Sequence, residues 1–117
     1  MEFNDNKPIY RQIIDYCFAS IMAGNWIPDA RVPSVRELAV TLAVNTHTVL
    51  KAFEFMQAHG IIYPKRGMGY YLASDAKDLI NVTRREEFFS DTLPSVFAEM
   101  RMLGIDIDDI VTKWKTT

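Results

Sequence analysis

Residues that can bind anions or hydrogen-bond to other molecules concentrate in two short segments of the 117-residue chain. The members are Asn45, Thr46, His47, Thr48 and Lys51 in the first segment and Lys65, Arg66 and Gly67 in the second. Hydroxyl groups can bond to phosphate or to base edges, and Asn and His can match donor and acceptor patterns on bases. The cations supply attraction to phosphate. These residue types favour a surface that contacts a nucleic acid.

Charge is unevenly distributed along the chain. The net charge of −2 argues against a protein that coats nucleic acid through bulk charge. Residues 31–70 nevertheless contain five Lys or Arg against two Asp or Glu, whereas residues 73–117 contain six against nine. A modest basic patch on an acidic protein suits specific attraction to phosphate. A chance scatter of charge is the alternative.

The sequence lacks the residues that catalysis or metal binding needs. It has two His and one Cys, no carboxylates clustered at catalytic spacing and no glycine-rich phosphate loop. A single cysteine, Cys17, can form neither an internal disulfide nor a zinc cluster, and its neighbours place it on the buried side of a helix. We therefore expect no enzymatic activity, no metal and no cofactor.

The expected location is the cytoplasm, with no membrane partner. No segment approaches the roughly 18 consecutive apolar residues of a membrane span. Residues 1–5 lack the basic and apolar parts of a signal peptide.

The order of apolar residues and turn signals predicts the elements that hold the two polar segments. Residues 9–22 have helical spacing, and two prolines make residues 26–33 an ordered loop. Ser34 followed three residues later by Glu37 is a capping box that starts a second helix. After a turn at residues 43–45, a third helix is expected to begin at Asn45 or Thr46 and to end at Gly60.

Two helices joined by a tight turn, the second with a polar start, form a helix-turn-helix. After residue 60 the pattern changes to short β-prone runs at 61–63 and 70–72 around a Pro- and Gly-containing turn at 64–69. This predicts a hairpin with a basic tip, the wing. The predicted fold is mainly α with a small β-hairpin, comprising a winged helix-turn-helix over residues 1–73 and a C-terminal helical dimerisation segment over residues 74–117.

The C-terminal segment is predicted to be helical and to need a partner. Pro94 indicates a kink or a new helix start between Asp91 and Pro94, and Gly104 ends that element before a last helix over about 106–115. So many apolar residues cannot bury themselves in so small a unit. We expect dimer contacts through Leu79, Phe88, Phe89, Leu93, Phe97 and Met100. Because such spacing is more typical of a core or dimer interface than of a ligand pocket, the sequence identifies no small-molecule effector.

Four motifs together resemble the DNA-binding domain of the GntR family of bacterial transcription regulators, over roughly residues 7–73. They are Pro8-Ile9-Tyr10-Arg11-Gln12-Ile13, Val32-Pro33-Ser34-Val35-Arg36-Glu37-Leu38-Ala39, Val44-Asn45-Thr46-His47-Thr48-Val49 and Gly67-Met68-Gly69-Tyr70-Tyr71. The short tail resembles the YtrA-type branch. Four positions depart from the usual family pattern, namely Asp29 for Gly, Val32 for Leu, Ala43 for Gly, and Thr46 for Arg or Pro.

The resemblance implies a sequence-specific DNA-binding transcription regulator, expected to be a repressor. It would bind a palindromic operator in double-stranded DNA as a homodimer. The resemblance places Arg36 at a DNA-contacting position and the wing residues Arg66 and Gly67, with Lys65 beside them, in the adjacent minor groove. Ser34 is also a candidate DNA contact, although its main expected role is to cap the second helix.

Other interpretations stay open. Arg36 could pair with Glu37 or another surface acid instead of DNA, and His47 could be an ordinary exposed residue at a helix start. His59 is expected to interact with the last carbonyls of its helix. Residues 84–87 are most simply a solvated helix face. For the whole chain, the alternative is a winged-helix module that binds or assembles proteins without binding DNA.

Overall fold

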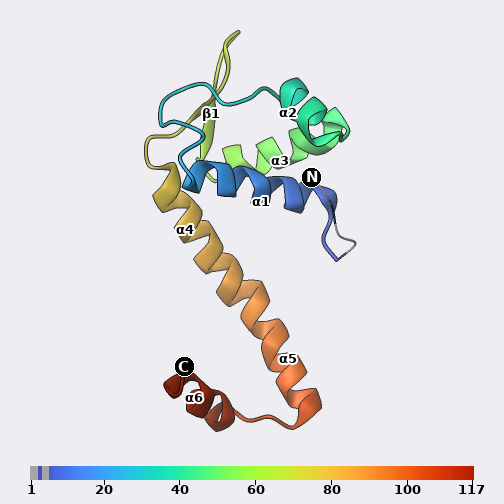
Figure 1. Cartoon of the computed structure of the whole chain (residues 1–117), viewed down its shortest axis with the longest axis vertical. Coiled ribbons are helices and arrows are strands. Elements are labelled where there is room, and N and C mark those ends of the chain that lie inside the picture. Colours follow the sequence, from blue (N-terminus) through green and yellow to red (C-terminus); the bar gives the residue numbers. More distant parts are fainter. Residues whose placement is uncertain (1–2, 4–5) are drawn as a thin grey trace. The chain divides into compact units, whose positions relative to one another are not determined.

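The computed structural model describes Phe3 and residues 6–117. These residues form two compact units, a first that extends to Asn81 and a second over Val82–Thr117. The first contains α1 (Ile9–Met22), α2 (Val35–Leu42), α3 (Thr46–Ala58), β1 (Ile62–Lys65) and β2 (Gly69–Leu72) (Figure 1). It also contains the beginning of α4 (Ala76–Glu87). The second contains the end of α4, a π-helical turn η1 (Phe88–Thr92), α5 (Leu93–Leu103) and α6 (Ile107–Lys115). The predicted composition of many helices and one hairpin is confirmed.

The first compact unit ends later in the chain than the DNA-binding domain predicted over residues 1–73. Of residues 1–5, considered above for a signal peptide, residues 1, 2, 4 and 5 lie outside the described part. Ala76 and Ile80, in the first turns of α4, are buried in the core of the first unit, so that unit extends beyond residue 73. The division into a DNA-binding domain and a dimerisation tail remains a prediction.

In the described part of the chain, no helix combines the length and the apolar character that crossing a membrane requires.

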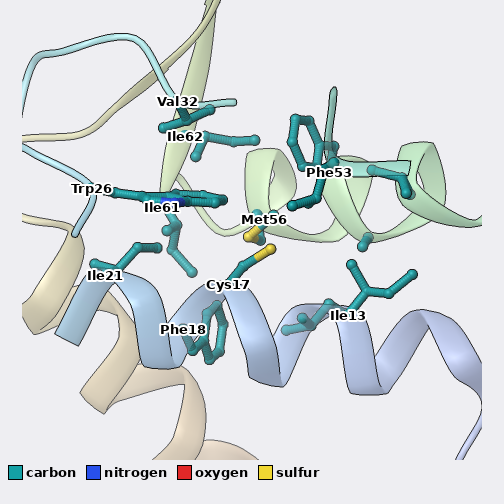
Figure 2. Close-up of a cluster of buried hydrophobic side chains, with 14 of the residues drawn as sticks. Ile13, Cys17, Phe18, Ile21, Trp26, Val32, Phe53, Met56, Ile61 and Ile62 are labelled. Atoms are coloured by element: carbon teal, nitrogen blue, oxygen red, sulfur yellow. The ribbon is translucent and has the colours of Figure 1, made fainter. Parts of the chain in front are cut away.

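Helix α3 lies at the centre of the first unit because it packs against α1, α2 and β1. Its residues Val49, Ala52, Phe53 and Met56 are all fully buried. Met56 faces Cys17 of α1 (Figure 2), and the ring of Phe53 meets that of Tyr70 edge to face at a centroid distance of 5.2 Å. Burial raises the pKa of the Cys17 thiol to about 12, which keeps this side chain a neutral apolar filler.

Side-chain caps begin both helices of the helix-turn-helix. The Ser34 hydroxyl accepts a hydrogen bond from the Glu37 amide at 3.0 Å, and the Glu37 carboxylate accepts one from the Ser34 amide at 3.4 Å, which confirms the predicted capping box. At α3 the cap is Asn45, whose Oδ1 accepts from the His47 amide at 2.8 Å. These bonds satisfy amides that a helix start leaves without a partner.

The turn between α2 and α3 depends on a left-handed residue. Ala43 has φ 55° and ψ 47°, and its amide and that of Val44 donate to the Val40 and Ala39 carbonyls at 3.2 and 3.0 Å. Such a conformation costs an L-residue with a side chain roughly 1–2 kcal/mol, which explains why a glycine is the usual choice there.

The strands of the hairpin extend further toward its tip than predicted. Strands β1 and β2 pair antiparallel from Ile62 with Leu72 to Lys65 with Gly69, so the exposed tip is residues 66–68. The loop before α2 adds a third, short pairing, because the Asp29 and Val32 amides donate to the Leu72 and Tyr70 carbonyls at 2.8 and 2.9 Å. The sequence indicated only an ordered loop at this place.

The second unit begins with an interrupted helix. The π-helical turn η1 directly precedes α5, whose second residue, Pro94, lacks the amide that a continuous helix would use. This confirms the change of element predicted near Asp91 to Pro94. Gly104, with φ 67°, ends α5, and a capping box between Asp106 and Asp109 starts α6.

Replacing Ala43 with Gly is expected to stabilise the protein by about 0.5–1 kcal/mol. Removing the Cβ relieves the left-handed strain, and this gain exceeds the added entropy of the unfolded chain. The matched control is Ala19→Gly at an exposed position in the last turn of α1, where the same change should destabilise by up to about 1 kcal/mol. Urea unfolding measures both, and equal signs for the two variants would contradict this account of the turn.

Candidate nucleic-acid interface

The start of α3 presents polar side chains to solvent. Thr46 and His47 are exposed and Thr48 is half-buried, while Val49 on the opposite side is fully buried. His47 makes no side-chain hydrogen bond or ion pair within the described residues, so its imidazole is available to a ligand. Asn45 is also exposed, but its side-chain oxygen is occupied as the helix cap. Its primary contribution is thus to orient the turn that displays Thr46 and His47.

The start of α2 supplies a cation and a cap. Arg36 is exposed and forms no hydrogen bond or ion pair with another described residue. Its sequence neighbour Glu37 instead pairs with Arg31 at 3.5 Å and caps Ser34, so the alternative pairing of Arg36 with Glu37 does not occur. Ser34 is half-buried with its hydroxyl in the capping box. Arg36 therefore fits a contact to an external anion, whereas Ser34 serves α2.

The hairpin carries two exposed cations, Arg66 at its tip and Lys65 beside the tip. Arg66 and Gly67 form the tip, where Gly67 has φ 74° and the Met68 amide donates to the Lys65 carbonyl at 2.9 Å. A positive φ at the third residue of a turn requires glycine or a similarly tolerant residue. The Lys65 ammonium lies 4.0 Å from the centre of the Tyr71 ring, which supports the side chain along the hairpin. The tip thus offers positive charge without bulky side chains at Gly67.

Lys51 is placed differently from the other cations. Its ammonium lies 4.0 Å from the centre of the Tyr10 ring, so it joins α3 to the beginning of α1. The residue is exposed, and a cation over an aromatic face keeps its charge available to a phosphate. The sequence did not predict the pairing with Tyr10, because the contact depends on how α1 and α3 pack.

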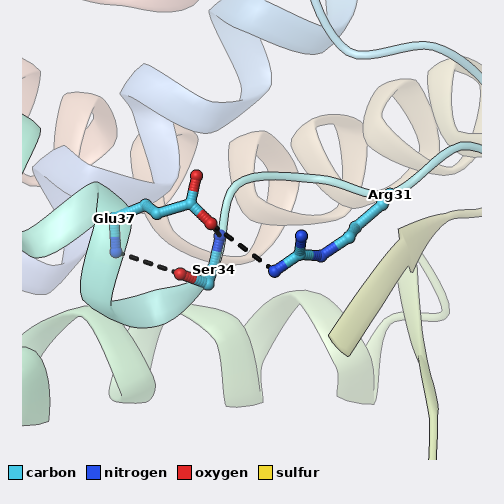
Figure 3. A network of polar contacts seen from close by, with 3 residues as sticks. All are labelled: Arg31, Ser34 and Glu37. Atoms are coloured by element: carbon cyan, nitrogen blue, oxygen red, sulfur yellow. Dashed lines mark hydrogen bonds and ion pairs between the residues drawn. The ribbon is translucent and has the colours of Figure 1, made fainter. Parts of the chain in front are cut away.

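Arg31 is a candidate that the sequence motifs did not single out. Besides pairing with Glu37 (Figure 3), its side chain lies against Gly69 of β2, and its backbone pairs with Tyr71. The available signal was only its place in the basic section, directly before Val32-Pro33-Ser34.

One titratable group beside the hairpin is perturbed. Partial burial raises the pKa of Tyr63, and the Asp29 carboxylate, which accepts a hydrogen bond from the Tyr63 hydroxyl at 3.3 Å, raises that pKa further. Asp29 itself has φ 61°, so it is the second left-handed position at which the family pattern has Gly. Its bond to Tyr63 gives the aspartate a local role that glycine could not fill.

The residues expected in a dimer contact divide into two groups. Phe88 and Phe89 are exposed to 45% and 56%, and Leu93 and Phe97 are half-buried. Leu79, by contrast, packs against the core of the first unit, and Met100 is buried. Further exposed apolar side chains that the sequence analysis did not select are Val96, Met102, Leu103, Ile107, Ile110, Val111 and Trp114.

The chemistry offered by these surfaces is anion binding and hydrogen bonding. Within the residues that the structure describes, no group of three His, Cys, Asp or Glu could hold a metal ion. Hydroxyl, imidazole and guanidinium groups around the starts of two capped helices, together with a basic hairpin tip, match the donor types that contact phosphates and base edges.

Known proteins are similar to this chain in sequence and in fold. The family model described as bacterial regulatory proteins, gntR family, matches residues 9–72. The HTH-type transcriptional repressor YtrA of Bacillus subtilis (strain 168) is 31% identical over 105 residues, which cover 90% of this chain and 80% of YtrA.

Solved structures of regulators are also similar to this chain in fold. A transcriptional regulator of the GntR family from Bacteroides thetaiotaomicron is 38% identical with a TM-score of 0.74, over 93% of this chain and 95% of that one. The DNA-binding domain of AraR in complex with operator ORR3 is 27% identical with a TM-score of 0.56, over 62% of this chain and 88% of that one.

We expect Ser34→Ala to lower the free energy of unfolding by about 1 kcal/mol, because the Glu37 amide loses its acceptor. Ser34→Asp should keep stability near that of the natural chain, since aspartate caps equally well. Ser74→Ala, an exposed serine outside the helices, is the control and should change stability by less than about 0.5 kcal/mol. Urea unfolding of the full chain measures the free energy of unfolding of each variant. Equal stability of the Ser34→Ala and Ser34→Asp variants would count against the capping role.

Proposed function

Because this chain belongs to the gntR family of bacterial regulatory proteins, it is a DNA-binding transcription regulator and not an enzyme, and we propose that it represses transcription from a palindromic operator as a homodimer. Repression is supported by the likeness to YtrA, which is named a repressor. Operator binding is supported by the likeness to the AraR domain, which was solved with its operator.

The observation that carries this proposal is the exposure of unpaired donors at the three elements predicted to contact DNA. Arg36 and His47 at the starts of α2 and α3 and Arg66 at the hairpin tip are all exposed. None of the three has an ion pair among the described residues. A guanidinium without a carboxylate partner can bind phosphate or guanine without first breaking a protein contact.

Helix geometry supports the contact at α3. The free amides and the dipole at a helix start attract phosphate, and recognition helices place their N-terminal residues at base edges. Thr46 and His47 occupy that turn. The hairpin tip, through Arg66 and Gly67, would extend the contact into a neighbouring minor groove, where arginine is favoured by the negative potential.

The homodimer is supported by exposed apolar surface in the second unit. Phe88 and Phe89 meet edge to face at a centroid distance of 5.3 Å and are about half exposed. Clusters of exposed aromatic and aliphatic side chains on a protein surface mark interaction sites. A symmetric pair of DNA-binding units would bind two half-sites related by the same two-fold axis. We accordingly propose the segment 74–117 as the dimerisation tail and the cytoplasm as the place of action.

Arg36→Ala is expected to weaken operator binding by about 1–3 kcal/mol, because a charged contact to phosphate or base is lost. The control is Lys77→Ala, an exposed cation of α4 that belongs to neither the proposed DNA contacts nor the proposed dimer contacts, and it should leave the affinity within about twofold of that of the natural chain.

Fluorescence anisotropy with the promoter of the protein's own operon, across a range of salt concentrations, measures both variants. Salt-sensitive and sequence-selective binding supports the regulator. If the natural chain binds no DNA at any salt concentration, the protein-assembly alternative gains support. Equal losses for Arg36→Ala and Lys77→Ala would contradict the assignment of Arg36.

Replacing Phe88 and Phe89 together with Glu should give monomers, because unpaired charges would be buried in the dimer. Operator affinity is then expected to fall about 100-fold or more, since the two units no longer bind as one. Sedimentation equilibrium and anisotropy measure the two effects, and circular dichroism checks folding. The control is Ile27→Glu, which places a charge on an exposed apolar residue of the first unit. An unchanged molecular mass for the Phe88 and Phe89 variant would refute the proposed interface.

A further inference from the structure

Arg31 joins the hairpin to the loop before α2 through its backbone. It forms an antiparallel bridge with Tyr71 of β2, and the neighbouring amides of Val32 and Leu72 donate to the Tyr70 and Ala30 carbonyls at 2.9 and 3.1 Å. The two-stranded hairpin therefore has a third short pairing partner at its base. Isolated two-stranded hairpins are only marginally stable, so this pairing supports the wing.

The Arg31 side chain continues along the hairpin because Gly69 leaves room for it. A Cβ at position 69 would lie 3.2 Å from the Arg31 Nε and 3.9 Å from its Nη2. Gly69 also has φ 93°, which disfavours other residues at this position. The guanidinium is thus packed against the first residue of β2, two residues from the exposed tip residue Gly67.

The guanidinium of Arg31 also contacts the first turn of α2. Its Nη2 lies 3.5 Å from Oε1 of Glu37, and the same carboxylate oxygen accepts from the Ser34 amide at 3.4 Å (Figure 3). Both side chains are more than half exposed, at 55% and 61%, so the pair contributes little to the free energy of folding. What the pair does instead is join the first turn of α2 to β2 through one rigid, planar group.

We propose that Arg31 is a positioning residue that, with Glu37, holds the basic wing at a fixed angle to the helix-turn-helix. This inference rests on the proposed binding of DNA. A wing already held in place loses less conformational entropy when its tip enters a groove, which favours specific binding. Because Glu37 neutralises Arg31 locally, Arg31 acts through the position of Arg66 and makes no phosphate contact of its own.

The first test needs no DNA. Cys17 is buried and protonated, so cysteines placed at the exposed positions Val40 on α2 and Met68 on the tip can be spin-labelled selectively in the full chain. Pulsed electron paramagnetic resonance then gives the distribution of distances between the label on α2 and the label on the hairpin tip. We expect Arg31→Ala and Glu37→Gln to broaden this distribution and the control Lys77→Ala to leave it unchanged. Glutamine can still cap the Ser34 amide, so Glu37→Gln isolates the ion pair.

The second test measures operator affinity relative to that for random DNA of equal length. Arg31→Ala and Glu37→Gln should each lower this ratio roughly two- to fivefold, the size that an exposed ion pair can contribute. Arg31→Lys should recover part of the loss. In the double variant Arg31→Ala with Arg66→Ala, this ratio should fall by less than the product of the two single fold-changes. In the double variant Arg31→Ala with His47→Ala, it should fall by the full product.

Opposite results would overturn the inference. If Arg31 contacted phosphate directly, Arg31→Ala would reduce the salt dependence of binding by about one unit of slope, and Glu37→Gln would tighten specific binding. An unchanged distance distribution in both variants would also exclude a positioning role. If the natural chain bound no DNA at all, the proposed function would fail, while the distance measurement would still report whether Arg31 holds the wing.

Discussion

The enclosure of α3 by three neighbouring elements is the constraint on which the rest of the structure depends. Val49, Ala52, Phe53 and Met56 are fully buried where α3 meets α1, α2 and β1. Burying each large apolar side chain stabilises the fold by roughly 1.5–3 kcal/mol, so any rotation of α3 about its axis would expose several of them at a prohibitive cost. The direction in which Thr46 and His47 point is therefore set by apolar packing on the other side of the helix.

The hairpin is held by weaker and more local means. Leu72 and Ile62 bury its base, but residues 64–69 are all exposed, and beyond the base the wing is supported by Tyr71, Lys65 and Arg31. The two parts of the interface are thus held by different means, since the core anchors the helix and surface contacts support the wing. The position of the wing relative to α3 therefore depends on these surface contacts.

Local signals in the sequence predicted most of the fold and part of the site. Helix α1, the Ser34 capping box and the hairpin follow from spacing, caps and turn residues, all of which act over a few positions. Contacts between distant segments were missed because no local pattern encodes them. Arg31 meets Gly69 and Tyr71 only once the chain has folded, and the same is true of Lys51 and Tyr10. Leu79 was placed in the tail interface by its helical spacing, yet it packs on the core of the first unit, because α4 begins inside that unit.

The π-helical turn before Pro94 has a geometric consequence for any surface that covers the second unit. A π turn inserts about one extra residue into a helix, and each residue of an α-helix advances the side chains by about 100° around the axis. Phe88 and Val96 are eight residues apart, as are Phe89 and Phe97, and the extra residue makes each separation equivalent to about two α-helical turns. The π turn therefore places the two phenylalanines in line with Val96 and Phe97, so one straight complementary surface can cover all four side chains.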